Sequence, residues 1–109
     1  FAGTDSAAHT EKCTPCGCAA GCFTGGIAPQ LYAQAFEEAD VDLSDTKNQE
    51  IFKNFLCRNG TDFHGIEQSN ETFTLSKTPQ TVDIIKTPTG DITPLPVGLG
   101  QGEIPWSIS

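Results

Sequence analysis

A helical repeat of apolar side chains runs from residue 28 to residue 39. It consists of Ala28, Leu31, Tyr32, Ala35, Phe36 and Ala39, which recur every three or four residues and therefore share one face of a helix. Pro29 suits the first turn, where a missing N–H removes no helical hydrogen bond. The pattern predicts a helix over residues 29–39.

A second helical pattern follows after a short acidic stretch. Its apolar face is formed by Ile51, Phe52, Phe55 and Leu56. Thr46 and Gln49 have the spacing of a capping box, in which each side chain bonds the other residue's backbone N–H. Gly60 is typical of a left-handed helix stop. These signals predict a helix over residues 46–58.

From residue 61 onward the helical repeat stops and short strand patterns begin. Residues 72–76 alternate between polar and apolar side chains, as in a strand with one buried face. Residues 81–87 and 91–94 are separated by the turn sequence Pro-Thr-Gly-Asp. The chain is therefore expected to contain a small antiparallel hairpin, which needs packing against the helices to be stable.

The last sixteen residues, 94–109, combine apolar side chains with Pro and Gly. This composition predicts an extended arm, since Pro and Gly disfavour helices and central strands. Its apolar residues are candidates for docking on a partner protein: Leu95, Val97, Leu99, Ile104 and Trp106. The equally weighted alternative is that the arm wraps over its own domain.

Together these patterns predict a small α+β fold that is irregular and rich in loops. Residues 1–12 have no periodicity and are expected to form a loose N-terminal arm that includes an exposed His9. A glycine-rich, cysteine-rich loop follows it. We expect one domain over residues 1–93 and the extended C-terminal arm over residues 94–109.

Charge and hydropathy narrow the range of partners. The chain of 109 residues has 6 basic and 14 acidic side chains, a net charge of −8, and a mean hydropathy of −0.24. A surface this acidic repels nucleic acid and anionic lipids. No window is apolar enough for a direct membrane span. We therefore expect a larger protein complex or a homo-oligomer as the partner.

Two features favour export from the cytosol. The chain starts at Phe1 and contains no Met, which suggests that a signal or transit peptide has been cleaved. Asn59 and Asn70 each begin an Asn-X-Thr sequon for possible glycosylation. These features predict an extracytoplasmic location, either secreted, periplasmic or in an organelle lumen, where disulfides persist.

Four of the five cysteines lie within ten residues, at Cys13, Cys16, Cys18 and Cys22. The first interpretation is a disulfide framework, for which fifteen pairings remain open. A bridge between this cluster and Cys57 would stabilise the fold by about 3–4 kcal/mol through loop entropy. An inert Cys57 thiol and thiol exchange at the Cys-X-X-Cys of residues 13–16 are alternatives.

The second interpretation of the cysteines is a thiolate metal site. Zinc or an iron–sulfur cluster could be bound by cluster cysteines, with Cys57 as a further ligand of the iron–sulfur cluster. Residues 13–18, Cys-Thr-Pro-Cys-Gly-Cys, resemble the C-T-x-C-x-C metal site of nitrile hydratase alpha subunits, with Gly17 in place of the family's Ser. The resemblance covers six residues and implies iron or cobalt bound by Cys13, Cys16, Cys18 and the amides of Gly17 and Cys18.

No catalytic group of nucleophile, base and orienting residue is visible in the sequence. The leading hypothesis is therefore a non-enzymatic, disulfide-stabilised, acidic accessory subunit that is exported and acts through protein–protein interaction. No cofactor is expected under this hypothesis. The alternative is a metal-thiolate protein, with a possible role in electron transfer, that uses residues 13–22.

Overall fold

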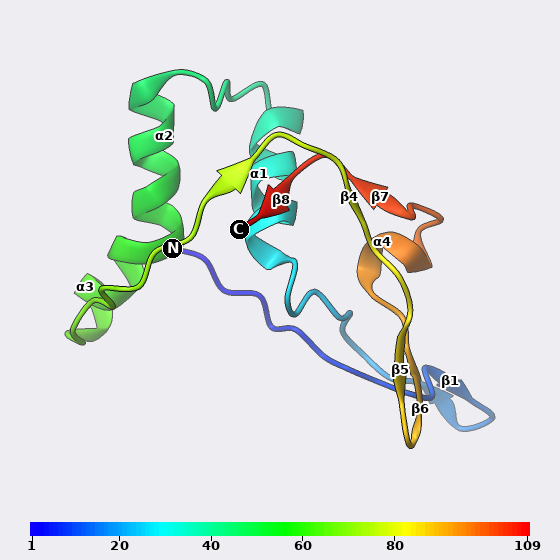
Figure 1. Ribbon diagram of the computed structural model, residues 1–109. Coiled ribbons are helices and arrows are strands. Elements are labelled where there is room, and N and C mark those ends of the chain that lie inside the picture. The colour runs from blue at the N-terminus through cyan, green and yellow to red at the C-terminus, as the bar shows by residue number, and fades with distance from the viewer.

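The computed structural model describes the whole chain, residues 1–109. Figure 1 shows two helical units beside each other, with short strands and hairpins extending to one side. The helical elements are α1 (Ala28–Glu38), α2 (Thr46–Lys53), the π-helix η1 (Asn54–Arg58), α3 (Asn59–His64) and α4 (Leu95–Gly98). Helices make up 31% of the chain and strands 18%, and no sheet is closed.

The eight strands form four separate antiparallel pairs. They are β1 (Cys13–Thr14) with β2 (Gly17–Cys18), β3 (Leu75–Ser76) with β8 (Ser107–Ile108), β4 (Gln80–Thr81) with β7 (Glu103–Ile104), and β5 (Ile85–Thr87) with β6 (Gly90–Ile92). The β1–β2 hairpin lies inside the segment for which the sequence predicts only an irregular loop. Its strands are two residues long, and Gly17 adopts a φ of 133° at the end of its turn. A hairpin this short leaves no alternating pattern to recognise.

Helix α1 ends in a Schellman motif built around Asp40, which has a φ of 61°. The Val41 N–H donates to the Phe36 carbonyl at 2.9 Å, and the Asp40 N–H donates to the Glu37 carbonyl at 2.9 Å. Val41 and Phe36 also pack against the same core cluster, as is common in this motif. The motif stops α1 although the left-handed position holds Asp rather than Gly.

The second helical unit, which consists of α2, η1 and α3, differs at both ends from the helix predicted over residues 46–58. Its N-cap is Asp45, whose carboxylate accepts a 3.1 Å hydrogen bond from the Asn48 N–H, so the predicted Thr46 capping box is wrong. Gly60 does not stop the helix, because the backbone widens into η1 and continues as α3. The helix ends at Gly65, which has a φ of 62°. Gly60 and Gly65 are both compatible with a helix end, and the prediction placed the end at Gly60 instead of Gly65.

The C-terminal segment is less extended than predicted. Residues 95–98 form the single turn α4, while β7 and β8 pair with strands from the middle of the chain. Pro at the start of α4 is compatible with a helix because it lies in the first turn. The segment thus packs on the rest of its own chain along much of its length.

Two small hydrophobic clusters form the interior. The first contains Ala33, Leu43, Phe52 and Trp106, and the second contains Ile27, Val82 and Ile104. Helix α1 contributes Ala33 to the first, and Ile27, just before α1, belongs to the second. The C-terminal segment likewise contributes one residue to each cluster, Trp106 and Ile104. These two segments therefore join the two clusters.

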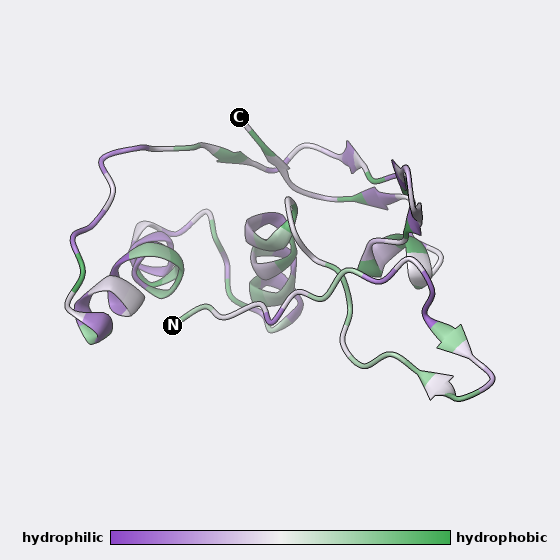
Figure 2. Ribbon diagram, turned by 90° about the horizontal axis from the view of Figure 1, so that it is seen from below, coloured by the Kyte–Doolittle hydropathy of each residue, from purple (hydrophilic) through white to green (hydrophobic).

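The chain buries little of its surface. Only 10 of 109 residues are buried, and the radius of gyration is 15.8 Å, compared with about 13 Å for a compact chain of this length. In Figure 2, hydrophobic stretches are spread over helices, strands and hairpins rather than gathered in one layer. No helix is both long and apolar enough to cross a membrane.

Glu37 connects α1 to the C-terminal segment through two hydrogen bonds. Its Oε2 accepts from the Trp106 indole N–H at 2.9 Å, and its Oε1 accepts from the Lys77 ammonium at 2.6 Å. Burial raises the pKa of Glu37, but the hydrogen bonds from Lys77 and Trp106 outweigh it, so the pKa is lowered overall. The ionised carboxylate therefore stabilises the folded chain.

Replacing Asp40 with Gly should stabilise the chain by about 0.5–1 kcal/mol, because Gly has no Cβ to strain the left-handed backbone and the change removes a carboxylate from the helix C-terminus. Asp42→Gly is the matched control. The Asp42 carboxylate accepts hydrogen bonds from the Ser44 N–H at 2.8 Å and Oγ at 2.7 Å, so its loss should destabilise. Urea unfolding measures the free energy of unfolding of both variants. Equal destabilisation by the two substitutions would contradict the Schellman motif at Asp40.

Acid should weaken the contact between α1 and the C-terminal segment. A carboxylate with a lowered pKa adds stability above its unfolded pKa of about 4.3, and that stability is lost as the pH falls through the folded pKa. Unfolding free energy, followed by the fluorescence of the single tryptophan, should fall between pH 6 and pH 3. Glu37→Gln should flatten this dependence and cost about 1–3 kcal/mol at neutral pH. An unchanged pH dependence in the variant would refute this role.

Candidate functional site

The N-terminal segment does not form a loose arm, because hydrogen bonds hold it along residues 20–25. The Ser6 Oγ accepts from the backbone N–H groups of Thr24 and Gly25 at 2.9 and 3.0 Å. One residue on, the Ala7 N–H donates to the Cys22 carbonyl at 2.9 Å. These polar contacts, rather than buried apolar side chains, fix the segment in place.

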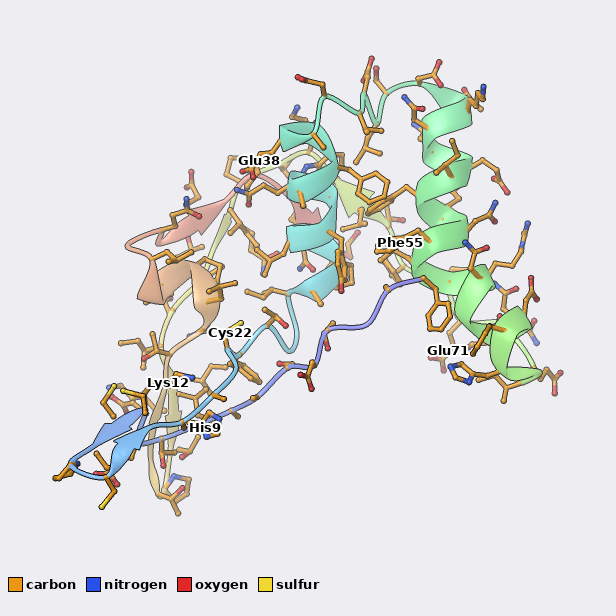
Figure 3. The ribbon with its side chains drawn as sticks, turned by 180° about the vertical axis from the view of Figure 1, so that it is seen from behind. His9, Lys12, Cys22, Glu38, Phe55 and Glu71 are labelled. Carbon is orange, nitrogen blue, oxygen red and sulfur yellow. The ribbon has the colours of Figure 1, made fainter.

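Two basic residues extend this arrangement toward the β1–β2 hairpin. The His9 Nε2 lies 2.9 Å from the Ala20 carbonyl, and the Lys12 ammonium donates to the Gly21 carbonyl. Because a carbonyl can only accept, the His9 Nε2 is the donor in this hydrogen bond. Figure 3 shows His9, Lys12 and Cys22 on the side of the molecule that carries the hairpins, away from Phe55 in η1 and from Glu71 in the loop that follows α3.

His9 and Lys12 line a hollow of about 290 Å³ between the N-terminal segment and the α4 region. Its other lining residues are Ala7, Thr10, Cys22, Phe23, Asp91, Thr93, Pro94, Leu95, Gly98 and Leu99. Two basic groups and one carboxylate among mostly small or apolar side chains suit a small ligand that carries a negative charge. This hollow is the candidate functional site.

Asp5 is a further functional candidate that the sequence did not reveal. Its φ is 44°, and Asp40 is the only other residue besides glycines with a positive φ. Non-glycine residues in the left-handed region are uncommon and concentrate at functional sites. No motif or spacing in the sequence marks Asp5, because only its backbone conformation in the structure distinguishes it. His9 could be noticed only as one of two histidines.

A second, larger groove of about 1000 Å³ lies between the second helical unit and residues 68–75. Its apolar lining residues include Leu43, Phe52, Leu56, Phe73, Leu75 and Trp106. Cys57, in η1, also lines it. The groove is open and mainly apolar, and no cluster of titratable groups marks a reaction centre within it.

All five cysteines are free and exposed. Cys13 lies opposite Cys18 across the β1–β2 hairpin and Cys16 lies in its turn, whereas Cys22 and Cys57 line different hollows. No group of three or more His, Cys, Asp or Glu residues could hold a metal ion. The structure therefore contains neither a cross-link from the cluster to Cys57 nor the thiolate site suggested by the nitrile hydratase resemblance.

The residues proposed for partner docking are separated by the fold. Ile104 and Trp106 are buried, with 1% and 9% of their surface exposed, while Leu99 is 69% exposed. Leu95 and Val97 are half-buried, and Val97 packs against the second cluster. The five residues thus do not form one continuous docking surface. The two sequon residues, Asn59 in α3 and Asn70 in the following loop, are both exposed.

The known proteins to which this chain is similar are named dihydroorotases. The chain is 39% identical over 110 residues to the dihydroorotase of Neisseria meningitidis, covering 99% of this chain and 29% of the relative. It is 40% identical over 111 residues to the dihydroorotase of Nitrosococcus oceani, covering 100% of this chain and 29% of that relative. The mitochondrial dihydroorotase of Arabidopsis thaliana is 40% identical over 101 residues, covering 90% of this chain and 25% of the relative. No protein-family model matches the chain.

These similarities overturn the functional predictions made from composition. The relatives are named as enzymes, so a non-enzymatic accessory subunit is wrong, as is the alternative of a metal-thiolate protein. One relative is named mitochondrial, and the predicted secreted, disulfide-rich, extracytoplasmic protein is wrong as well. The prediction of an extracytoplasmic location was wrong because neither the missing Met nor the two sequons report directly on the compartment. Nearly the whole of this chain matches these dihydroorotases. The chain spans less than a third of their length.

Proposed function

We propose that this chain contributes to a dihydroorotase-type enzyme, acting on dihydroorotate or a closely related cyclic compound. The observation that carries the proposal is the identity of 39–40% with dihydroorotases over nearly the whole chain. An identity of 39–40% over about 110 residues is far above what a shared composition produces. The relatives' remaining length supplies whatever else the reaction requires.

Within such an enzyme, the hollow beside the N-terminal segment is the proposed contribution to the site. Dihydroorotate carries a carboxylate, and His9 and Lys12 present basic groups to a space of about 290 Å³. Asp5 lies two residues before Ala7 of the hollow, and its unusual backbone conformation favours a functional role. Asp5 is exposed and does not itself line the hollow. A carboxylate in this neighbouring position is suited to proton transfer, whereas His9, which lines the hollow, is suited to binding and orienting an anion.

Dihydroorotases are in general zinc-dependent. This chain alone does not form a complete zinc site, because no three His, Cys, Asp or Glu side chains come together and protein zinc sites commonly use three or four ligands. We therefore assign no metal ligand to this chain.

A chimera tests the proposal directly. The matched region of the Neisseria meningitidis dihydroorotase is replaced with this chain, and dihydroorotate ring opening is followed by ultraviolet absorbance. We expect activity well above that of the relative lacking the region. Asp5→Asn should lower kcat by about 100-fold or more if the carboxylate transfers a proton. His9→Ala should mainly raise KM, by about tenfold, since it removes a hydrogen-bonding side chain from the proposed binding hollow.

The chain offers a matched control in its second histidine. His64 is exposed and packs against the rings of Phe1 and Phe63, outside the hollow. His64→Ala should leave kcat and KM within about twofold, as is usual for surface changes away from a site. A folded chimera without activity would contradict the proposed function. An active chimera in which His9→Ala and His64→Ala behave alike would contradict the proposed site.

A further inference from the structure

The β1–β2 hairpin holds two thiols directly opposite each other. Cys13 pairs with Cys18 and Thr14 pairs with Gly17, with Pro15 and Cys16 forming the two-residue turn. Residues opposite each other on antiparallel strands project from the same face. The proximity of Cys13 and Cys18 is therefore a result of the hairpin fold and not only of their spacing in the sequence.

The register places this pair at a site suited to a disulfide. The next pair outward is hydrogen-bonded, because the Ala19 N–H donates to the Lys12 carbonyl at 2.8 Å. Bonded and non-bonded pairs alternate along antiparallel strands, so Cys13 and Cys18 form a non-bonded pair. In such pairs the Cα atoms lie about 4.5 Å apart, at the short end of the range of about 4.4–6.8 Å found in disulfides.

Local hydrogen bonds define the hairpin without help from the thiols. The Thr14 Oγ1 donates to the Gly17 carbonyl at 3.1 Å and accepts from the Cys16 N–H at 3.2 Å. The contact between the thiols also affects their chemistry. A hydrogen bond with the Cys18 thiol, followed by burial, raises the pKa of Cys13, and the Lys12 charge opposes this only in part.

We propose that Cys13 and Cys18 form a reversible thiol-modification site that reacts with small-molecule disulfides such as glutathione disulfide. One thiolate attacks the reagent, forms a mixed disulfide and releases one glutathione thiolate. The second thiol then loses its proton, attacks the mixed disulfide and releases the second glutathione. Overall, two protein thiols are oxidised to one disulfide, and one glutathione disulfide is reduced to two glutathione molecules.

This site differs from the structural disulfide framework considered from the sequence. The hairpin is defined by its strand pairing and by the hydrogen bonds of Thr14 while both thiols are free. The inference does not depend on the proposed enzymatic function.

The other cysteines lack this arrangement. Cys16 lies in the turn and has no cross-strand partner, while Cys22 lines the hollow beside His9. Cys57 lines the separate groove beside the second helical unit. Cys16 and Cys22 are six residues apart, whereas Cys13 and Cys18 are five apart. The pair Cys16 and Cys22 is therefore a close control for the effect of sequence spacing alone.

Two triple variants of the 109-residue chain provide the test. The C16S/C22S/C57S variant keeps the hairpin pair, and the C13S/C18S/C57S variant keeps the control pair. Each is incubated with glutathione disulfide and measured by intact mass. The hairpin variant should lose the mass of two hydrogens and regain it with dithiothreitol. The control should mainly gain bound glutathione, with a ratio of closed to mixed product lower by at least about tenfold.

Repeating both reactions in concentrated urea shows whether the fold is responsible. In urea the two variants should give similar ratios of closed to mixed disulfide, since the spacings are nearly equal. Accumulation of mixed disulfide in the native hairpin variant would overturn the proposal. Equal closure of the two native variants, or a preference that persists in urea, would also overturn it.

Discussion

The fold depends on the C-terminal segment joining two small cores that would otherwise be separate. Ile104 enters one cluster and Trp106, two residues later, enters the other. The indole N–H of Trp106 also bonds Glu37 of α1, which in turn pairs with Lys77 at 2.6 Å. In a chain with so few buried residues, each of these contacts accounts for a large share of the stability.

The candidate site depends on this interior only indirectly. The N-terminal segment is held mainly by polar contacts, such as those of Ser6 and His9 with backbone groups of residues 20–25. Polar contacts at the surface contribute less than apolar burial and open more easily. The N-terminal segment and the hollow beside it are therefore expected to be the more adaptable part of the molecule.

The sequence predicts the structure best where apolar side chains repeat. The predicted helix at residues 29–39 corresponds closely to α1 at Ala28–Glu38, and the turn near Gly90 lies between β5 and β6. Helix ends and the burial of Gln30 could not be predicted, because they depend on backbone geometry and distant partners. The Asp5 conformation leaves no trace in the sequence. The state of the clustered cysteines could not be predicted, since close spacing alone does not distinguish free thiols from disulfides or metal ligands.

The most direct test of the link between the two cores is the effect of Ile104→Ala on unfolding followed by Trp106 fluorescence. Ile104 belongs to one cluster and Trp106 reports on the other. If the clusters form one cooperative unit, the unfolding free energy seen by Trp106 falls by about 2–4 kcal/mol. Leu99→Ala, at a position 69% exposed, should change it by less than about 0.5 kcal/mol. An unchanged Trp106 transition in Ile104→Ala would show that the two clusters unfold independently.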